Sequence, residues 1–100
     1  MATGVGIHPT AVVDQSAEFG DEVEVGPGCV IGPNVKLGDR TRLVAHVFIE
    51  SHTSLGKDNV VFPFAALGGA PQDLSYRGEA TRLEIGDNNV IREHATLSRG

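Results

Sequence analysis

The sequence predicts an all-β fold in which short parallel strands wind into a three-sided coil, and a six-residue repeat is the main reason. From Ile7 to Leu67 an aliphatic or aromatic residue occupies the first position of eleven consecutive groups of six. The fifth position is mostly small or β-branched, and glycine often fills the second. A period of six fits neither an amphipathic helix nor an alternating strand, but it is typical of a hexapeptide parallel β-helix.

Each part of the repeat has a physical role in such a coil. The first-position side chain points into a narrow triangular prism, and three groups of six complete one coil. A small fifth-position residue leaves room beside it, and we expect glycine to supply corner conformations that a Cβ disfavours. Coils then stack about 4.8 Å apart as parallel strands, and each buried aliphatic contributes roughly 1.5–3 kcal/mol. The chain provides about four to five coils.

The repeat is interrupted once, in the segment QDLSYRGEATRLE at 72–84. An uninterrupted frame would turn Asp73 and Glu79 inward, and burying two unpaired carboxylates would cost more than one coil contributes. We therefore expect a loop of about 73–84 to leave the prism before the coil resumes at Ile85. In that case Ile85 continues the column of Phe19, Leu37 and Leu55. The uninterrupted frame would place it above Val13, Ile31, Ile49 and Leu67.

The composition indicates one soluble domain, residues 1–100. The net charge of −5 argues against nucleic acid or an anionic membrane surface as a partner. Cys29 is the only cysteine, so no internal disulfide forms, and its inward position places it in the core. The start, MATGVGIHPT, lacks the features of a signal peptide, and no apolar run is long enough to span a membrane. We expect a cytoplasmic protein without membrane insertion.

The expected loop is rich in hydrogen-bonding side chains. Loops of this length without secondary structure often carry function. A solvated insertion without a role is an equal alternative on the residues alone. The polar set consists of Gln72, Asp73, Tyr76, Arg77, Glu79 and Arg82.

Three motifs carry a narrower resemblance. The segment GGAPQDLSYRGEATRLEIGDNNVIREHATLSRG, preceded by IHPTAVV and VGPGCVIGP, resembles the acyl-[acyl-carrier-protein]–UDP-N-acetylglucosamine O-acyltransferases of lipid A biosynthesis. The resemblance runs from about Ile7 to Gly100. It implies a left-handed β-helix, a homotrimer with the substrate cleft between subunits, and no cofactor. The implied reaction moves a 3-hydroxyacyl chain from acyl carrier protein to the 3-hydroxyl of the sugar nucleotide.

The resemblance also implies two substrate-binding residues, Gln72 and Asp73, of which the aspartate hydrogen-bonds the substrate. Two departures are visible. Ser75 stands where the family commonly has lysine, so a charged contact to the nucleotide sugar that the resemblance implies has no lysine to make it here. Ser98 stands where some members have histidine.

No catalytic residue is assigned, because the family's catalytic histidine lies beyond the position of Gly100. We therefore expect a C-terminally truncated part of a longer enzyme. A non-catalytic scaffold or self-assembling module is the alternative. His8, His46, His52 and His94 are expected at the surface or in packing contacts between subunits. Their spacing does not match the His-x4-His pattern of hexapeptide metalloenzymes, so no metal site is expected.

Overall fold

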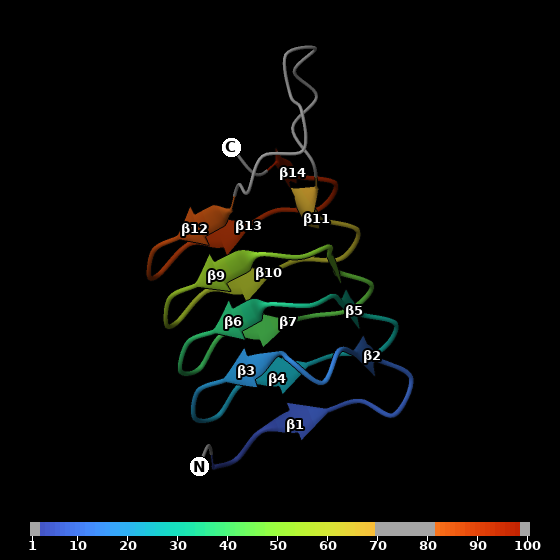
Figure 1. Ribbon diagram of the computed structural model, residues 1–100, viewed down its shortest axis with the longest axis vertical. Helices are drawn as coiled ribbons and strands as arrows, with labels where there is room; N and C mark the ends of the chain where they lie inside the picture. The colour runs from blue at the N-terminus through green and yellow to red at the C-terminus, as the bar shows by residue number, and fades with distance from the viewer. Residues whose placement is uncertain (1–2, 70–81, 99–100) are drawn as a thin grey trace.

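The computed structural model describes residues 3–69 and 82–98. They form short strands arranged in three sheets, and the strands within each sheet are parallel (Figure 1). Sheet A contains β1 (Gly6–Ile7), β4 (Glu24–Val25), β7 (Arg42–Leu43), β10 (Val60–Val61) and β13 (Val90–Ile91). Sheet B contains β2 (Val12–Val13), β5 (Val30–Ile31), β8 (Phe48–Ile49), β11 (Ala66–Gly69) and β14 (Thr96–Ser98). Sheet C contains β3 (Glu18–Phe19), β6 (Val35–Leu37), β9 (Thr53–Leu55) and β12 (Leu83–Ile85).

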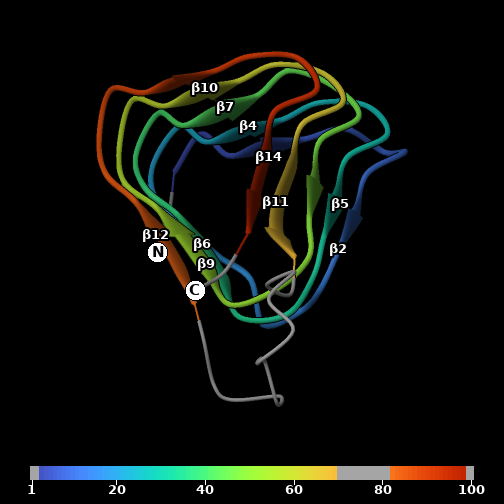
Figure 2. The ribbon, with the colours of Figure 1, turned by 90° about the horizontal axis from the view of Figure 1, so that it is seen from above.

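The chain visits the three sheets in turn, so each strand pairs with the strand one coil later. Val25 lies opposite Leu43, and Ile31 lies opposite Ile49, each an offset of eighteen residues. Seen from above, the sheets form the three walls of a prism (Figure 2). The fold is a left-handed parallel β-helix: the repeat predicted the parallel coil, and the family resemblance predicted its left hand.

The interior of the prism is filled by the first and fifth positions of the repeat. First-position residues such as Ile31, Leu43 and Ile49 are at most 1% exposed. From Val23 to Ala65 the fifth-position residues are as well buried, and they include three polar side chains. Asn59 illustrates how these are accommodated, because its Nδ2 donates to Gly86 O and its Oδ1 accepts the Asn89 N–H, both at 2.8 Å. A buried amide with both ends paired avoids the desolvation cost of an orphan polar group.

The expected role of the second-position glycines is confirmed only at Gly68, which has a φ of 77°, and it is wrong at the others. Left-handed backbone instead occurs at the fourth position, mostly in residues with a side chain, including Asn34, His46 and Asp58 with φ of 59°, 50° and 59°. Asn, Asp and His tolerate this region better than most residues. The second position is kept small by crowding between coils. A Cβ on Gly26, for example, would overlap the carbonyl oxygen of Val44 in the next coil.

The register after the interruption agrees with the extruded-segment frame. Strand β12 pairs with β9, and Ile85 lies opposite Leu55, which continues the column of Phe19 and Leu37. The offset from Leu55 to Ile85 is thirty residues instead of eighteen. Leu83 and Glu84, the last residues of the expected loop, belong to the strand. The rest of that loop, except Arg82, lies outside the described residues.

Candidate functional site

One turn of the coil touches both ends of the interruption. Residues Glu50–Thr53, which we call the anchor turn, comprise the turn from β8 to β9 and the first residue of β9, at the corner between sheets B and C. After the interruption, Leu83 pairs with Thr53, and its N–H donates to His52 O at 3.0 Å. Before it, Gly68 and Gly69 lie against the same turn. The described residues on both sides of the interruption therefore contact the same turn.

Gly68 fits this place for two reasons. Its φ of 77° is in the left-handed region, and β11 shifts register against β14 between Leu67 and Gly69. A Cβ on Gly68 would overlap Thr53 Oγ1 and lie 2.8 Å from Ser51 O. This irregularity resembles a bulge, a feature that bends a strand and ends its regular pairing.

The predicted substrate-binding residues Gln72 and Asp73 lie outside the described residues, as do Ser75, Tyr76, Arg77 and Glu79. Arg82 is described. It is exposed, and its Nε lies 3.0 Å from Glu84 Oε1. Ser98 ends β14 and is exposed. The anchor turn was not identified from the sequence, although the Gly68–Gly69 pair ahead of a polar segment was a usable signal.

The histidines occupy corners of the prism. His46 and His94 stack on the two faces of Phe64, with ring centroids 5.5 and 5.6 Å apart and nearly parallel planes. His52 Nε2 lies 3.4 Å from Asn34 Nδ2, and His8 Nδ1 lies 2.9 Å from Thr10 Oγ1. Within residues 3–69 and 82–98, no three histidine, cysteine or acidic side chains are grouped so as to hold a metal ion.

The outer face of sheet B differs from the other two walls. Its outward residues are Val12, Val30, Phe48, Ala66 and Thr96, none of which is charged. The stacked corner of His46, Phe64 and His94 adjoins this row. Sheets A and C instead carry paired charges outward, such as Glu24 with Arg42 and Glu18 with Lys36. An uncharged wall of this kind is suited to contact with another protein surface.

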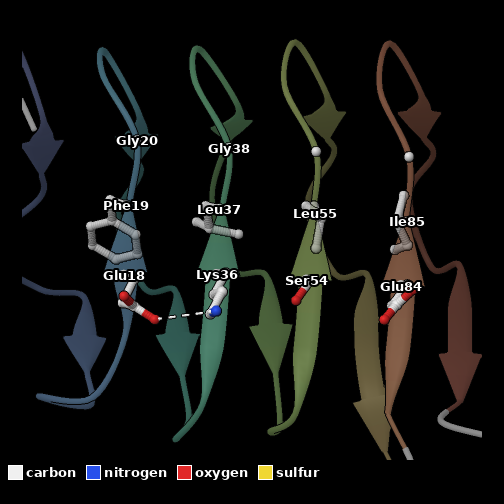
Figure 3. Close-up of a pocket in the computed structure, with 12 residues that line it drawn as sticks. Glu18, Phe19, Gly20, Lys36, Leu37, Gly38, Ser54, Leu55, Glu84 and Ile85 are labelled. Carbon is white, nitrogen blue, oxygen red and sulfur yellow. Dashed lines mark ion pairs between the residues drawn. The ribbon is translucent and has the colours of Figure 1, made fainter.

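Sheet C carries a shallow groove of about 730 Å³ (Figure 3). Its lining includes the outward row of Glu18, Lys36, Ser54 and Glu84 and the glycine column of Gly20, Gly38, Gly56 and Gly86. Glu18 Oε2 and Lys36 Nζ form an exposed ion pair at 3.7 Å. The row does not converge on one point, so it offers no arrangement for acid–base catalysis.

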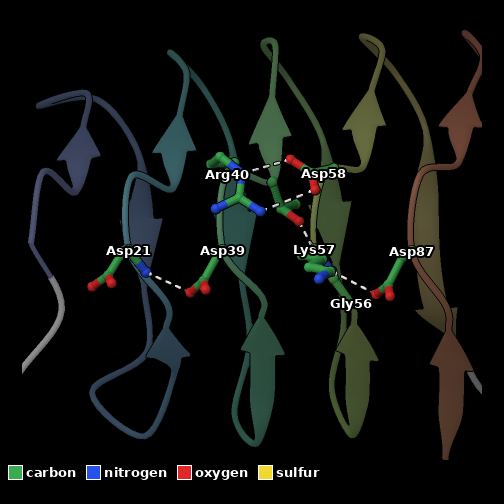
Figure 4. A network of polar contacts seen from close by, with 8 residues as sticks. Asp21, Asp39, Arg40, Gly56, Lys57, Asp58 and Asp87 are labelled. Atoms are coloured by element: carbon green, nitrogen blue, oxygen red, sulfur yellow. Dashed lines mark hydrogen bonds and ion pairs between the residues drawn. The ribbon is translucent and has the colours of Figure 1, made fainter.

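The corner between sheets C and A is a structural network (Figure 4). Side chains from one coil bond to backbone of its neighbour: the Asp21 and Lys57 N–H groups donate to Asp39 Oδ1 and Asp87 Oδ1 at 2.8 Å. Arg40 donates to both oxygens of Asp58, at 2.7 and 3.1 Å. The hydrogen bond from Arg40 lowers the pKa of Asp58. These hydrogen bonds and the Arg40–Asp58 ion pair hold neighbouring coils together.

Cys29 is completely buried at a fifth position, as its place in the repeat predicted. Burial raises the pKa of its thiol. A protonated thiol enclosed by aliphatic side chains is a packing group and a poor nucleophile.

No helix in the described part of the chain is long and apolar enough to cross a membrane.

Comparisons with known proteins find the hexapeptide repeat and a similarity to UDP-N-acetylglucosamine O-acyltransferases. Residues 16–51 match the family model of the bacterial transferase hexapeptide (six repeats). Over 93 residues the chain is 50% identical to the acyl-[acyl-carrier-protein]–UDP-N-acetylglucosamine O-acyltransferase of Thermodesulfovibrio yellowstonii. The match covers 93% of this chain but 36% of that enzyme.

Solved structures show the same relation. UDP-N-acetylglucosamine O-acyltransferase (LpxA) from Moraxella catarrhalis RH4 superposes with a TM-score of 0.91 at 49% identity. LpxA from Acinetobacter baumannii superposes with a TM-score of 0.92 at 50% identity. Each match covers 94% of this chain, and 37% and 36% of the solved chains. The chain therefore spans about a third of the length of the relatives it matches.

Proposed function

We propose that this chain, which belongs to the hexapeptide-repeat UDP-N-acetylglucosamine O-acyltransferases, is the N-terminal β-helical segment of an enzyme that transfers a 3-hydroxyacyl chain from acyl carrier protein to the sugar 3-hydroxyl. The observation that carries the proposal is the 50% identity, which extends over 93% of the chain. A match of that extent covers the interruption as well as the regular coils. The thirty-residue offset at Ile85, twelve more than a regular coil, supports an insertion into the repeat at the point where the family resemblance places substrate contacts.

In this reaction the sugar 3-hydroxyl attacks the thioester carbonyl of the acyl carrier protein. A base takes the hydroxyl proton, and the tetrahedral intermediate collapses to an ester as the thiol leaves. We propose that Gln72 and Asp73 bind the nucleotide sugar, with the aspartate carboxylate accepting a hydrogen bond from a sugar hydroxyl. The base would come from the part of the enzyme that follows the matched third. The product would be the first intermediate of lipid A biosynthesis, made in the cytoplasm.

We further propose that the enzyme is a homo-oligomer, a trimer by family resemblance, in which copies meet along sheet B. Support comes from the uncharged row that contains Val12, Val30 and Phe48, and from the exposed stack around Phe64. The charge-bearing faces of sheets A and C would then remain in contact with water.

A chimera tests the acyltransferase proposal. The chain replaces the segment that it matches in the Moraxella catarrhalis enzyme, and acyl transfer from 3-hydroxyacyl carrier protein to UDP-N-acetylglucosamine is measured. We expect the chimera to be active and the isolated chain to be inactive. Turnover by the isolated chain would show that the base lies within these residues. A folded but inactive chimera would favour the non-catalytic scaffold.

Asp73→Ala in the active chimera tests the assignment of the substrate residue. We expect kcat/KM to fall by about a hundredfold or more, the size typical of losing one positioned catalytic hydrogen-bonding group. The melting temperature should change little, because the segment lies outside the repeating frame. Asp87→Ala, at an exposed corner, is the control and should leave kinetics unchanged. Activity retained in Asp73→Ala would contradict the assignment.

A further inference from the structure

The anchor turn holds both described ends of the interruption, and this gives it a role beyond the coil. Leu83 N–H donates to His52 O at 3.0 Å on the returning side. On the departing side, Gly68 is seated against Ser51 and Thr53, and a Cβ on Gly69 would lie 3.1 Å from Glu50 Oε2. A shift of this one turn would displace both ends together. The intervening residues, 70–81, include the proposed substrate residues.

Thr53 fixes the shape of the anchor turn. Its side chain is fully buried, and its Oγ1 donates to Ser51 O at 2.8 Å, two residues back along the chain. The residues below it in the same column are Ala17 and Val35, which have no hydroxyl. The column therefore does not require a polar residue for packing. In this column the hydroxyl is found at Thr53, the residue that lies against Gly68.

Gly68 makes the contact specific. The close approach to Thr53 leaves no space for a Cβ here, and the left-handed φ of 77° also favours glycine. Thr53 and Gly68 thus fit each other: the hydroxyl occupies the space that a Cβ on residue 68 would need. Any residue other than glycine would have to push the turn or the departing strand aside.

We propose that the anchor turn is the positioning platform of the substrate-binding segment, with Thr53 and Gly68 as positioning residues. Neither touches substrate. Their contact holds the described residues on either side of 70–81, Gly69 and Leu83, and through them it supports sugar binding by Gln72 and Asp73. This inference rests on the proposed acyltransferase function. Small displacements of substrate-contacting groups are enough to reduce turnover strongly.

The test compares two buried threonines in the active chimera. Thr53→Val removes the hydroxyl of the anchor turn and keeps the volume. Thr41→Val removes an equivalent one, since Thr41 is also fully buried and its Oγ1 donates to Gly56 O at 2.7 Å, at the corner between sheets C and A. Both variants lose one buried hydrogen bond, so their melting temperatures should fall by similar amounts. Thr53→Ser keeps the hydroxyl and serves as the rescue variant.

We expect Thr53→Val to raise KM for UDP-N-acetylglucosamine about tenfold, with a smaller change in kcat, because a misplaced segment weakens sugar binding. Thr41→Val should leave both constants within about twofold of the parent, and Thr53→Ser should restore KM. Equal values of KM and kcat in Thr53→Val and Thr41→Val would contradict the proposal that the anchor turn positions the substrate-binding residues. Loss of activity in Asp73→Ala alone would then leave the acyltransferase proposal standing.

A second measurement needs no activity and uses the 100-residue chain itself. Hydrogen exchange at the Leu83 amide reports the returning contact to His52. We expect exchange at Leu83 to be at least tenfold faster in Thr53→Val and in Gly68→Ala, and unchanged in Thr41→Val. An unchanged Leu83 amide in both anchor-turn variants would contradict the inference, even if the chimera were inactive.

Discussion

Except at Gly68, the glycines at the second position of the repeat have a backbone conformation that other residues can adopt, and crowding from the neighbouring coil disfavours a side chain in most of these places. Gly26 shows this clearly. Its φ is not in the left-handed region, yet the space for a Cβ is taken by the backbone carbonyl of Val44. Backbone cannot move aside as a flexible side chain can. The distance between stacked coils therefore determines which residue is accepted here.

A pair of alanine substitutions tests this interpretation. Gly26→Ala should destabilise the chain by about 1–3 kcal/mol, because the methyl group forces two coils apart. Gly86→Ala occupies the same repeat position, but a Cβ there meets no atom within 4 Å. We expect it to be neutral or to stabilise by about 0.4–1 kcal/mol, through a less flexible unfolded chain. Denaturant unfolding of both variants makes the comparison, and equal destabilisation would show that crowding is not the cause.

At the scale of single elements, the corner between sheets C and A joins coils through charge. Arg40 and Asp58 belong to adjacent coils and form two hydrogen bonds. The pKa of Asp58 is lowered mainly by the hydrogen bond from Arg40. A carboxylate with a lower pKa in the folded state stabilises the fold above its unfolded pKa. That contribution is lost as the pH falls through the folded pKa.

Arg40→Gln should raise the pKa of Asp58 toward the usual value of an aspartate, which NMR titration of the carboxyl resonances would show. Asp14 provides an internal control, because its pKa is lowered by hydrogen bonds from Ser16 in the same turn. That pKa should not change in the variant. Acid unfolding below about pH 4 should also depend less steeply on pH. An unchanged Asp58 titration would mean that Arg40 does not pair with it in solution.

The elements differ in how far the sequence could specify them. The first and fifth positions identified the interior because burial requires an apolar or small residue wherever the chain turns inward. The break in the repeat likewise predicted the column of Ile85, since burying Asp73 and Glu79 would have been costly. The corner conformation was missed, because His46 and Phe64 adopt left-handed backbone without a glycine to indicate it.

The candidate site was less accessible to sequence reasoning. The contact of Gly68 with Thr53 joins residues of different coils, and it depends on a local register shift that no periodic pattern contains. The left hand of the coil came from the family resemblance, because the general preference of parallel crossovers is right-handed. Gln72 and Asp73 stay a prediction from that resemblance, since both lie outside the described residues.

At the scale of the whole molecule, the chain is a solenoid whose three walls have different surfaces. In a solenoid each coil contacts only its neighbours, so outward rows are free to vary without altering the core. Sheets A and C use this freedom for charged pairs. Sheet B instead keeps an uncharged row with Phe48 at 51% exposure, beside Phe64 at 58%. Aromatic side chains so exposed are enriched where proteins meet.

The oligomer proposal can be tested with two substitutions of similar exposure. Phe48→Lys places a charge in the middle of sheet B, whereas Val90→Lys does so on sheet A, where the valine is 60% exposed. If copies meet along sheet B, the first variant buries an unpaired ammonium in every contact and should weaken association at least a hundredfold. The second should leave the mass in sedimentation equilibrium unchanged. In both variants the melting temperature of the unassociated chain should equal that of the parent chain, because neither side chain packs inside the prism. Association lost equally in both variants would place the contact elsewhere on the molecule.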